Sequence, residues 1–257
     1  AIKNNQSAVA ITDLGKMFNT ISFYEKARAK GVKAIIGVDA YIETDITNPN
    51  GYNEPTRLLL LCKNDKGYKN LLSLVSRANT ENIKQEIPFI KQSWLKENTE
   101  GIIALSGDSL SGELALDCIT ESDVPYKDRV RNVIPKVNQY KEFFPDGFFL
   151  EIQRADRPTD DIFVRSMASL SYATKTPLVA THPVQFEKRE DFYAHEVRTC
   201  LNQNTYVDDV KRETKFTRDQ YFKSTEEMEE LFKDIPQALT NSAAVSFTHL
   251  RRPTIYS

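Results

Sequence analysis

The sequence predicts an α/β fold, and within that class a distorted seven-stranded β/α (TIM-like) barrel. Apolar, strand-like runs alternate with helix-like stretches along the chain, a pattern that is typical of parallel βα units. Several runs are continuously apolar, as expected for strands covered on both faces. Seven strand candidates favour a barrel over an open sheet, and barrels reach 257 residues as one domain. We therefore expect a single domain over residues 1–257.

The strand candidates are short apolar runs, most of which end in a polar turn. The run 33–43 has the sequence KAIIGVDAYIE, and the run 57–62 has the sequence RLLLLC. Both are rich in the aliphatic residues that buried strands carry. In chain order, the expected strands are residues 8–12, 33–43, 57–62, 101–106, 148–153, 177–181 and the start of the segment 247–251.

The stretches between these runs have helical character. Residues 68–78 place Leu71, Leu72 and Val75 on one face. Ser224 or Thr225 can cap a helix whose first turn is rich in Glu, which suits the positive end of the helix dipole. Gly31 and Pro145 are stop signals for two further helices. The expected helices are residues 18–30, 68–78, 129–144, 158–174, an amphipathic stretch within 191–201, and 225–232.

The amino-acid composition disfavours some classes of function. The net charge of −2 and a pI near 6.0 argue against a surface that is basic throughout, which disfavours a DNA-binding module. Short basic runs occur at 127–131 and 251–252, where the ordinary interpretation is a solvated surface. The three cysteines are widely spaced and form no CxxC motif, which indicates a reducing compartment such as the cytosol. No apolar stretch approaches membrane-spanning length.

Two aspartates at predicted strands are candidate functional residues, each with an alternative. Asp13 follows the first strand and is either a metal ligand or general base, or a cap for the next helix. Asp39 lies inside a strand run, where an ionised carboxylate needs a partner. That partner is either a cation at the barrel mouth or an arginine such as Arg57.

The three histidines of the chain are also candidate functional residues. His182 follows the strand run 177–181 and is either a metal ligand or a hydrogen-bonded strand-end residue. His195 and Glu196 lack the second histidine of an HExxH motif, so we interpret them as a packing or hydrogen-bonding pair. His249 and Arg251 share one face of an expected strand, where they either hold an anion or pair with carboxylates.

Together these segments resemble the polymerase-and-histidinol-phosphatase (PHP) domain at the front of the bacterial replicative DNA polymerase III α subunit. No single block decides the resemblance, but their joint order is specific and covers nearly the whole chain. The blocks are residues 10–42, 60–78, 101–114, 143–154, 177–201 and 221–242. The resemblance implies a PHP-type barrel.

The order of one segment departs from the family pattern. In the family, a strand like residues 247–257 opens the protein and precedes the AITD sequence, whereas here it closes the chain. We therefore expect either a circular permutation or an altered order of segments. In either case residues 247–251 should form a strand beside residues 8–12, with Ser257 near Ala1.

The ligand positions also depart from the family pattern. The resemblance implies that members with an intact site hold a metal cluster with strand-end His, Asp and Glu residues, which generates hydroxide for phosphoryl chemistry. Most of these ligands are replaced here. Two ligands are kept, His249 and Asp13. The replaced positions are Pro253, Leu14, Arg57 and Gln185 where the family has His, Asp39 where it has Glu, Asp108 where it has Cys or His, and Pro183 where it has Asp.

The resemblance therefore implies a catalytically degenerate PHP domain with no cofactor. Arg57 would replace a divalent cation electrostatically, and Asp13 or Asp39 would pair with Arg57 or Arg251 in the former site. The implied roles are a structural scaffold of the polymerase and a docking surface for the proofreading exonuclease (ε) subunit, in the bacterial cytoplasm. The parent nucleotidyltransferase would contact DNA through its other parts. The former metal-site cleft would comprise Asp13, Asp39, Arg57, Asp108, His182, His249 and Arg251.

A competing hypothesis is that the chain retains metal-dependent catalytic activity. The chain would then be a residual metal-dependent phosphoesterase, similar to a 3′–5′ exonuclease or a pyrophosphatase. Zn²⁺, Mn²⁺ or Mg²⁺ would bind weakly at Asp13, Asp39 and His249, with Asp108 and His182 close by.

Overall fold

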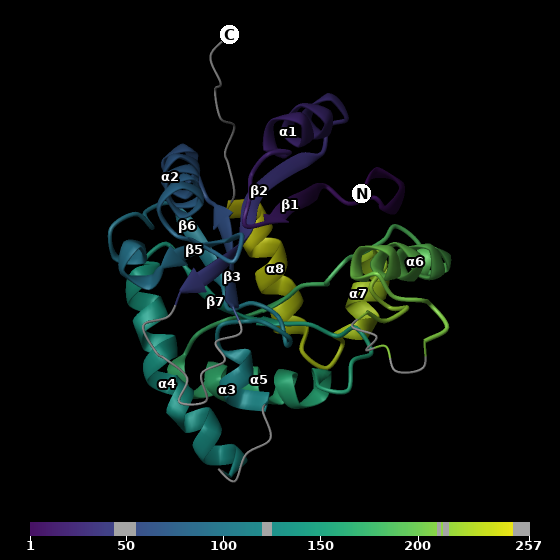
Figure 1. The fold of residues 1–257 in the computed structure, drawn as a ribbon. Helices are drawn as coiled ribbons and strands as arrows, with labels where there is room; N and C mark the ends of the chain where they lie inside the picture. The colour runs from purple at the N-terminus through teal and green to yellow at the C-terminus, as the bar shows by residue number, and fades with distance from the viewer. Residues whose placement is uncertain (44–54, 120–124, 210–211, 213–215, 249–257) are drawn as a thin grey trace.

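One mixed sheet organises the chain (Figure 1). The computed structural model describes residues 1–43, 55–119, 125–209, 212 and 216–248. Its strands pair in the order β4-β5-β2-β3-β6-β7-β8, and β1 joins the sheet by pairing with β2. The strands are β1 (Ala8–Leu14), β2 (Lys33–Glu43), β3 (Thr56–Cys62), β4 (Ile83–Lys84), β5 (Ile87–Lys91), β6 (Ile102–Leu105), β7 (Phe148–Ile152) and β8 (Leu178–Ala180).

The strand directions correct one expectation. The pairs β1–β2, β2–β5, β6–β7 and β7–β8 are parallel, as βα units require. However, β3 runs antiparallel to both of its neighbours, β2 and β6. In the β2–β3 register Gly37 faces Leu61 and Ile42 faces Thr56. The expectation that strands separated by helices pair in parallel is therefore wrong for β3 and β6.

The expected strand at 247–251 is also corrected in part. Residues 247 and 248 end helix α8 (Pro236–Thr248) instead of opening a strand, because the helical pattern of the preceding residues continues through them. Residues 249–257, with His249 and Arg251, lie outside the described residues. Within the described chain β1 pairs only with β2 and β8 only with β7, so barrel closure and the altered segment order stay predictions.

Most helix predictions are confirmed. Helices α8 and α3 (Ala115–Ile119) and strands β4 and β5 were not expected from the sequence. The confirmed helices are α1 (Thr20–Ala29), α2 (Asp65–Glu81), α4 (Tyr126–Phe143), α5 (Asp160–Thr174), α6 (Phe192–Gln203) and α7 (Thr225–Leu231). The short 3₁₀ turns are Ile2–Asn4, Gln92–Lys96 and Arg189–Asp191.

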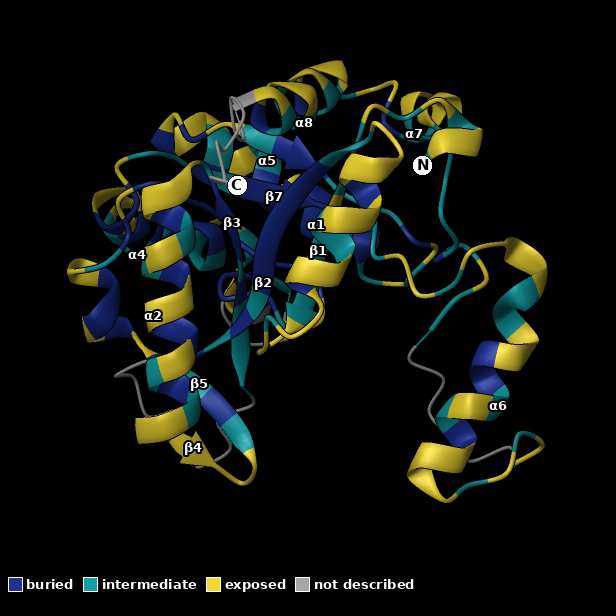
Figure 2. Ribbon diagram, turned by 90° about the horizontal axis from the view of Figure 1, so that it is seen from above, coloured by how far each residue is buried: buried dark blue, intermediate teal, exposed yellow. Residues whose placement is uncertain are grey.

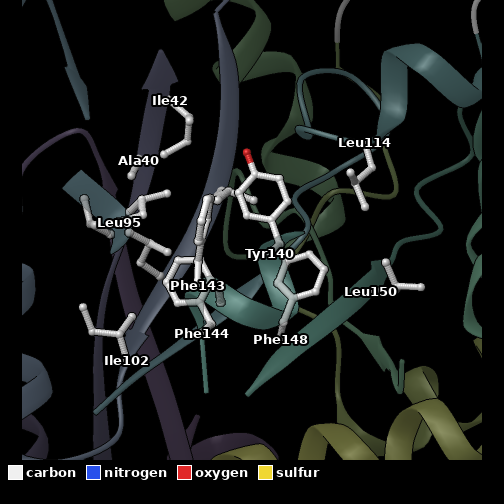
Figure 3. Close-up of a cluster of buried hydrophobic side chains, with 14 of the residues drawn as sticks. Ala40, Ile42, Leu95, Ile102, Leu114, Tyr140, Phe143, Phe144, Phe148 and Leu150 are labelled. Carbon is white, nitrogen blue, oxygen red and sulfur yellow. The ribbon is translucent and has the colours of Figure 1, made fainter. Parts of the chain in front are cut away.

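The larger core lies between one face of the sheet and helices α2, α4 and α5. Figure 3 shows the aromatic part of this core, where Tyr140, Phe143 and Phe144 pack near Phe148 and Leu150. The rings of Tyr140 and Phe148 stack with centroids 5.5 Å apart. Burial of these large side chains from water is the main source of stability for this face.

The opposite face of the sheet carries a smaller core that involves α8. Val245 of α8 packs with Ile35, Leu61, Leu105 and other side chains of the sheet. Hydrogen bonds fix the helix next to the end of the sheet: Asn241 Nδ2 donates to the Leu178 carbonyl (2.7 Å), Ser242 Oγ to the Ala180 carbonyl (2.6 Å), and Lys33 Nζ to the Ser246 carbonyl (2.8 Å). Helix α8 thus links β8 to the start of β2.

Helix α6 stands apart from the sheet on an extension of the chain (Figure 2). This extension has its own small core, in which His195 contacts the rings of Phe186 and Phe216. The neighbouring Glu196 pairs with Arg212, with Oε2 and Nη2 2.5 Å apart. The interpretation of His195 and Glu196 as packing and hydrogen-bonding residues is confirmed.

The close contact between α2 and the turn before β6 gives a stability prediction. Asn64 caps α2 by accepting from the Gly67 amide (2.9 Å), and a Cβ at Gly67 would lie 1.7 Å from the Gly101 carbonyl oxygen. Gly67→Ala should lower the free energy of unfolding by about 2–4 kcal/mol, because backbone has to move. At Gly31 (φ +69°) a Cβ meets nothing within 4 Å, so Gly31→Ala should cost only about 1 kcal/mol. Urea unfolding measures both, and equal losses would contradict the close contact.

Candidate functional site

The candidate site is centred on the guanidinium of Arg57. Arg57 lies on β3, and Asp39 lies on the same face of the neighbouring β2. Arg57 Nη1 is 2.5 Å from Asp39 Oδ2, Nη2 is 3.5 Å from Asp108 Oδ2, and Nε donates to Ser111 Oγ at 2.6 Å. The three charged side chains are between 16% and 26% exposed, so these ion pairs are partly shielded from water. Of the two arrangements considered for Asp39, pairing with Arg57 is confirmed.

The loop after β6 is shaped to hold Asp108 against Arg57. Asp108 Oδ1 accepts from the Leu110 amide (3.0 Å), the Ser111 amide (2.8 Å) and Ser111 Oγ (3.0 Å). The backbone of Arg57 closes the other side, since its amide donates to the Ser111 carbonyl at 2.8 Å. Gly107 has φ +85°, and a Cβ there would lie 2.7 Å from the Arg57 carbonyl oxygen. Only glycine permits this close approach of loop and strand.

Glu151 is a further carboxylate near this site, which the sequence analysis missed. It lies on β7, where its Oε1 accepts from Thr181 Oγ1 and, at 2.9 Å, from Gln153 Nε2. Burial raises the pKa of Glu151 to about 7, the charges of Asp108 and Asp39 add to this, and the two hydrogen bonds oppose it. The signal was present in the sequence: a glutamate inside the apolar run FFLEIQ resembles the aspartate inside the run 33–43.

The pKa of Asp39 is also raised, and burial is again the main cause. Burial raises its pKa to about 6, although the Arg57 guanidinium acts in the opposite direction, and the charge of Asp108 raises it further. The site therefore holds two carboxylates, Asp39 and Asp108, around one guanidinium, with the buried carboxyl group of Glu151 nearby. Two of these carboxyl groups hold a proton more readily than exposed carboxylates do.

Asp13 and His182 do not join this group by direct contact. Asp13 aligns with Val38 in the β1–β2 register, while Leu14 aligns with Asp39 and so shares its face. The Asp13 carboxylate accepts from Asn19 Nδ2 at 2.9 Å, next to the start of α1, which fits a local structural role better than a ligand role. His182 Nε2 donates to the Asp219 carbonyl at 2.7 Å. His249 and Arg251 lie outside the described residues.

Comparisons with known proteins identify the family of the chain. A family model described as "PHP domain" matches residues 1–155. The chain belongs to the PHP family. It is 36% identical over 239 residues to the DNA polymerase III subunit alpha of Pseudomonas fluorescens, with 93% of this chain covered. The Haemophilus influenzae protein of the same name is 34% identical over 95% of the chain, and that of Escherichia coli K12 is 34% identical over 93%.

This PHP chain spans about a fifth of the length of those curated relatives, 19% to 20%. The resemblance seen in the sequence is thereby confirmed at the level of the family. No helix in the described part of the PHP chain combines the length and the hydropathy needed to span a bilayer.

The described residues of this PHP domain do not fit a metal cluster. Within the described ranges no three His, Cys, Asp or Glu side chains are placed to hold one metal ion. Asp39 and Asp108 instead share the Arg57 guanidinium, whose charge would repel a cation at that point. Leu14, at a position where the resemblance implies a histidine, lies beside Asp39 and contributes no donor atom.

Removal of the Arg57 guanidinium should lower the stability of the fold. Arg57→Ala leaves Asp39 and Asp108 facing each other without a cation, so we expect the free energy of unfolding at pH 7 to fall by about 2–4 kcal/mol. The control is Arg131→Ala, because Arg131 is 79% exposed and should cost no more than about 0.5 kcal/mol. Chemical denaturation of both variants provides the comparison. Similar small losses in both would show that Arg57 does not stabilise the site.

The raised pKa of Glu151 predicts a pH dependence of stability. Its pKa is 4.5 in an unperturbed carboxyl and about 7 in the folded chain, so the folded state binds the proton more tightly. Stability therefore falls as pH rises from about 4.5 to 7, by an amount on the order of 2–3 kcal/mol. Glu151→Gln, which cannot ionise, should be more stable than the wild type at pH 8 and should lose this slope.

The matched control for Glu151→Gln is Glu100→Gln, since the Glu100 side chain is 75% exposed. Urea midpoints at pH 5 and pH 8 for the three proteins make the test. A Glu151→Gln protein with the wild-type slope would mean that Glu151 is ionised in the folded state throughout this range.

Proposed function

We propose that this PHP chain is part of a bacterial replicative DNA polymerase III α subunit and acts there as a non-catalytic structural domain in the cytoplasm. The observation that carries the proposal is the position of Arg57. Its guanidinium lies between Asp39 and Asp108 and supplies positive charge from within the protein. A side chain that holds these carboxylates together stabilises the fold and leaves fewer of their oxygens for a metal ion.

The relatives support the polymerase context. All those described above are named DNA polymerase III subunit alpha, and each match extends over at least 93% of this chain. Since the chain spans about a fifth of their length, DNA synthesis would depend on parts of the polypeptide outside it. The proposed immediate partner is therefore the remainder of the polymerase subunit.

We further propose that the domain docks the proofreading exonuclease subunit. This part of the proposal is supported by the resemblance alone. Its test is a direct binding measurement between the purified chain and the exonuclease subunit, by calorimetry and by gel filtration. Failure to bind would remove docking from the proposal and leave the structural role untouched.

The non-catalytic proposal has its own test. The purified chain should show no metal-dependent hydrolysis of p-nitrophenyl phosphate, a nucleotide 3′-end or pyrophosphate in the presence of Zn²⁺, Mn²⁺ or Mg²⁺. Elemental analysis after dialysis should find well under one metal ion per chain. Stoichiometric metal, with turnover that Asp39→Asn and Asp108→Asn abolish, would contradict the proposal and favour the phosphoesterase hypothesis.

A variant makes this assay sharper. Arg57→Ala removes the guanidinium but adds no donor atom, so it should not create hydrolysis even if it frees Asp39 and Asp108. Turnover that appears in Arg57→Ala would mean that the remaining ligands are sufficient and that Arg57 suppresses a latent site.

A further inference from the structure

Helix α6 carries polar side chains on its inner face and large apolar side chains on its outer face. His195, Glu196 and Cys200 are buried, whereas Tyr193 is 67% exposed and Leu201 is 77% exposed. A helix on the surface of a soluble domain normally has the opposite distribution, with its apolar face against the core. The outer face of α6 therefore has the composition of a surface that another part of a protein covers.

The polar residues on the inner face are satisfied within the protein. The Glu196 carboxylate pairs with Arg212, with Oε2 and Nη2 2.5 Å apart, and neither side chain is more than 8% exposed. His195 packs edge-on against the ring of Phe216, with centroids 4.6 Å apart. A rotation of α6 that buried its apolar face would break the ion pair and leave a charge without its partner. The outer face is thus fixed in its exposed position.

The segment that carries α6 is held at its base and presents the helix away from the sheet. We call residues 184–222 the α6 extension, and the structure describes all of it except 210–211 and 213–215. At its base the Gln185 amide donates to the carbonyl of the fully buried Gln220 at 2.8 Å. Figure 2 shows α6 projecting from the body of the molecule. The main contact of α6 with another element of the fold is the 3₁₀ turn Arg189–Asp191.

The exposed apolar residues of α6 follow one line along the helix. Tyr193, Val197 and Leu201 are spaced four residues apart, so they lie on the same side. Arg198 is exposed beside Val197 and forms no ion pair within the described residues. Tyr206, which is 83% exposed, comes shortly after the helix. We call Tyr193, Val197, Arg198 and Leu201 the α6 stripe. Apolar residues gathered in this way indicate an interaction surface, whereas single exposed ones are ordinary.

The comparisons indicate in which kind of protein this surface is used. The PHP family model matches residues 1–155, so the α6 extension lies beyond it. The match to the DNA polymerase III subunit alpha of Pseudomonas fluorescens includes 239 of the 257 residues, which leaves too few unmatched residues to exclude the whole extension. The extension is therefore a feature that this chain shares with the polymerase relatives outside the segment that the PHP model describes.

We propose that the α6 stripe packs against an apolar surface in the remainder of the polymerase polypeptide, with a carboxylate of that surface facing Arg198. This inference rests on the proposed place of the chain in the polymerase subunit. The chain spans 19% to 20% of the relatives' length, so most of such a polypeptide is available to cover the stripe. Burial of Tyr193 and Leu201 removes apolar area from water, and a covalent connection lets a small surface suffice.

Cysteine labelling measures the burial of the stripe directly, because the three natural cysteines of the chain are buried. Leu201→Cys would be introduced into the purified chain and into the full-length subunit that contains it. Mass spectrometry would follow the rate of maleimide modification at residue 201. The thiol should react as an exposed thiol in the chain, and about tenfold or more slowly in the full-length subunit.

The matched control is Tyr172→Cys on α5. Tyr172 is also 80% exposed, but it stands alone on its helix with Lys175 Nζ 4.5 Å from its ring centroid. It should react at the same rate in the chain and in the full-length subunit. Equal protection at residues 172 and 201 would overturn the assignment to the stripe.

Variants of Arg198 test the charged part of the interface. In the full-length subunit Arg198→Glu should restore rapid labelling of Leu201→Cys, because two carboxylates would then face each other. Arg198→Lys keeps the charge and should keep most of the protection. If Leu201→Cys itself loosens the interface, Tyr206→Cys reports from beside the stripe. Protection that Arg198→Glu leaves unchanged would overturn the facing carboxylate.

The remaining outcomes distinguish other occupants of the stripe. Concentration-dependent protection in the chain alone, with a dimer in gel filtration, would overturn the proposal in favour of a second copy. Protection that appears only when the exonuclease subunit is added would overturn it in favour of that partner. Rapid labelling in a full-length subunit that synthesises DNA would overturn the interface and leave the proposed function standing. A full-length polypeptide without DNA synthesis would contradict the proposed function, and the inference with it.

Discussion

The arrangement of charges around Arg57 is the constraint on which this end of the molecule depends. Asp39 lies in the middle of a sheet and Asp108 on a loop that folds back over it, and neither is fully solvated. Carboxylates in such positions need a counter-charge at short range. The guanidinium provides it from within the sheet, and its planar set of donors reaches Asp39, Asp108 and Ser111 together.

The topology explains how one arginine reaches three partners. Because β3 runs antiparallel between β2 and β6, Arg57 stands near the start of its strand, beside the end of β2 and the loop after β6. The backbone of Arg57 also pairs with that loop, and Gly107 lets the two approach closely. Glu151, one strand farther along, remains outside the reach of the guanidinium, and the raised pKa reflects its burial.

The sequence predicted much of the fold, because strands and helices are encoded by local patterns. Six strand runs and six helices lie where apolar periodicity, Gly31, Pro145 and the STEEMEE cap place them. The direction of β3 could not be predicted in this way, since pairing between strands depends on contacts distant in sequence. Residues 247 and 248 were predicted to open a strand from a short local run, but the helical pattern that precedes them continues through them.

The candidate site was predictable in part. An aspartate inside a strand required a partner, and Arg57 was one candidate. Glu151, inside the apolar run 148–153, carried the same signal. Asp13 shows that a position at a strand end does not by itself identify a site residue. In the β1–β2 register Leu14, and not Asp13, lies on the same face as Asp39.

The central claim is that Arg57 serves as the cation for these carboxylates, and a double-mutant cycle tests it most directly. The free energy of unfolding at pH 7 would be measured for the wild type, Arg57→Met, Asp39→Asn and the double variant. We expect a favourable coupling energy of about 1–3 kcal/mol between the two side chains. A coupling energy within about 0.3 kcal/mol of zero would contradict the account, because the two groups would then contribute to stability independently.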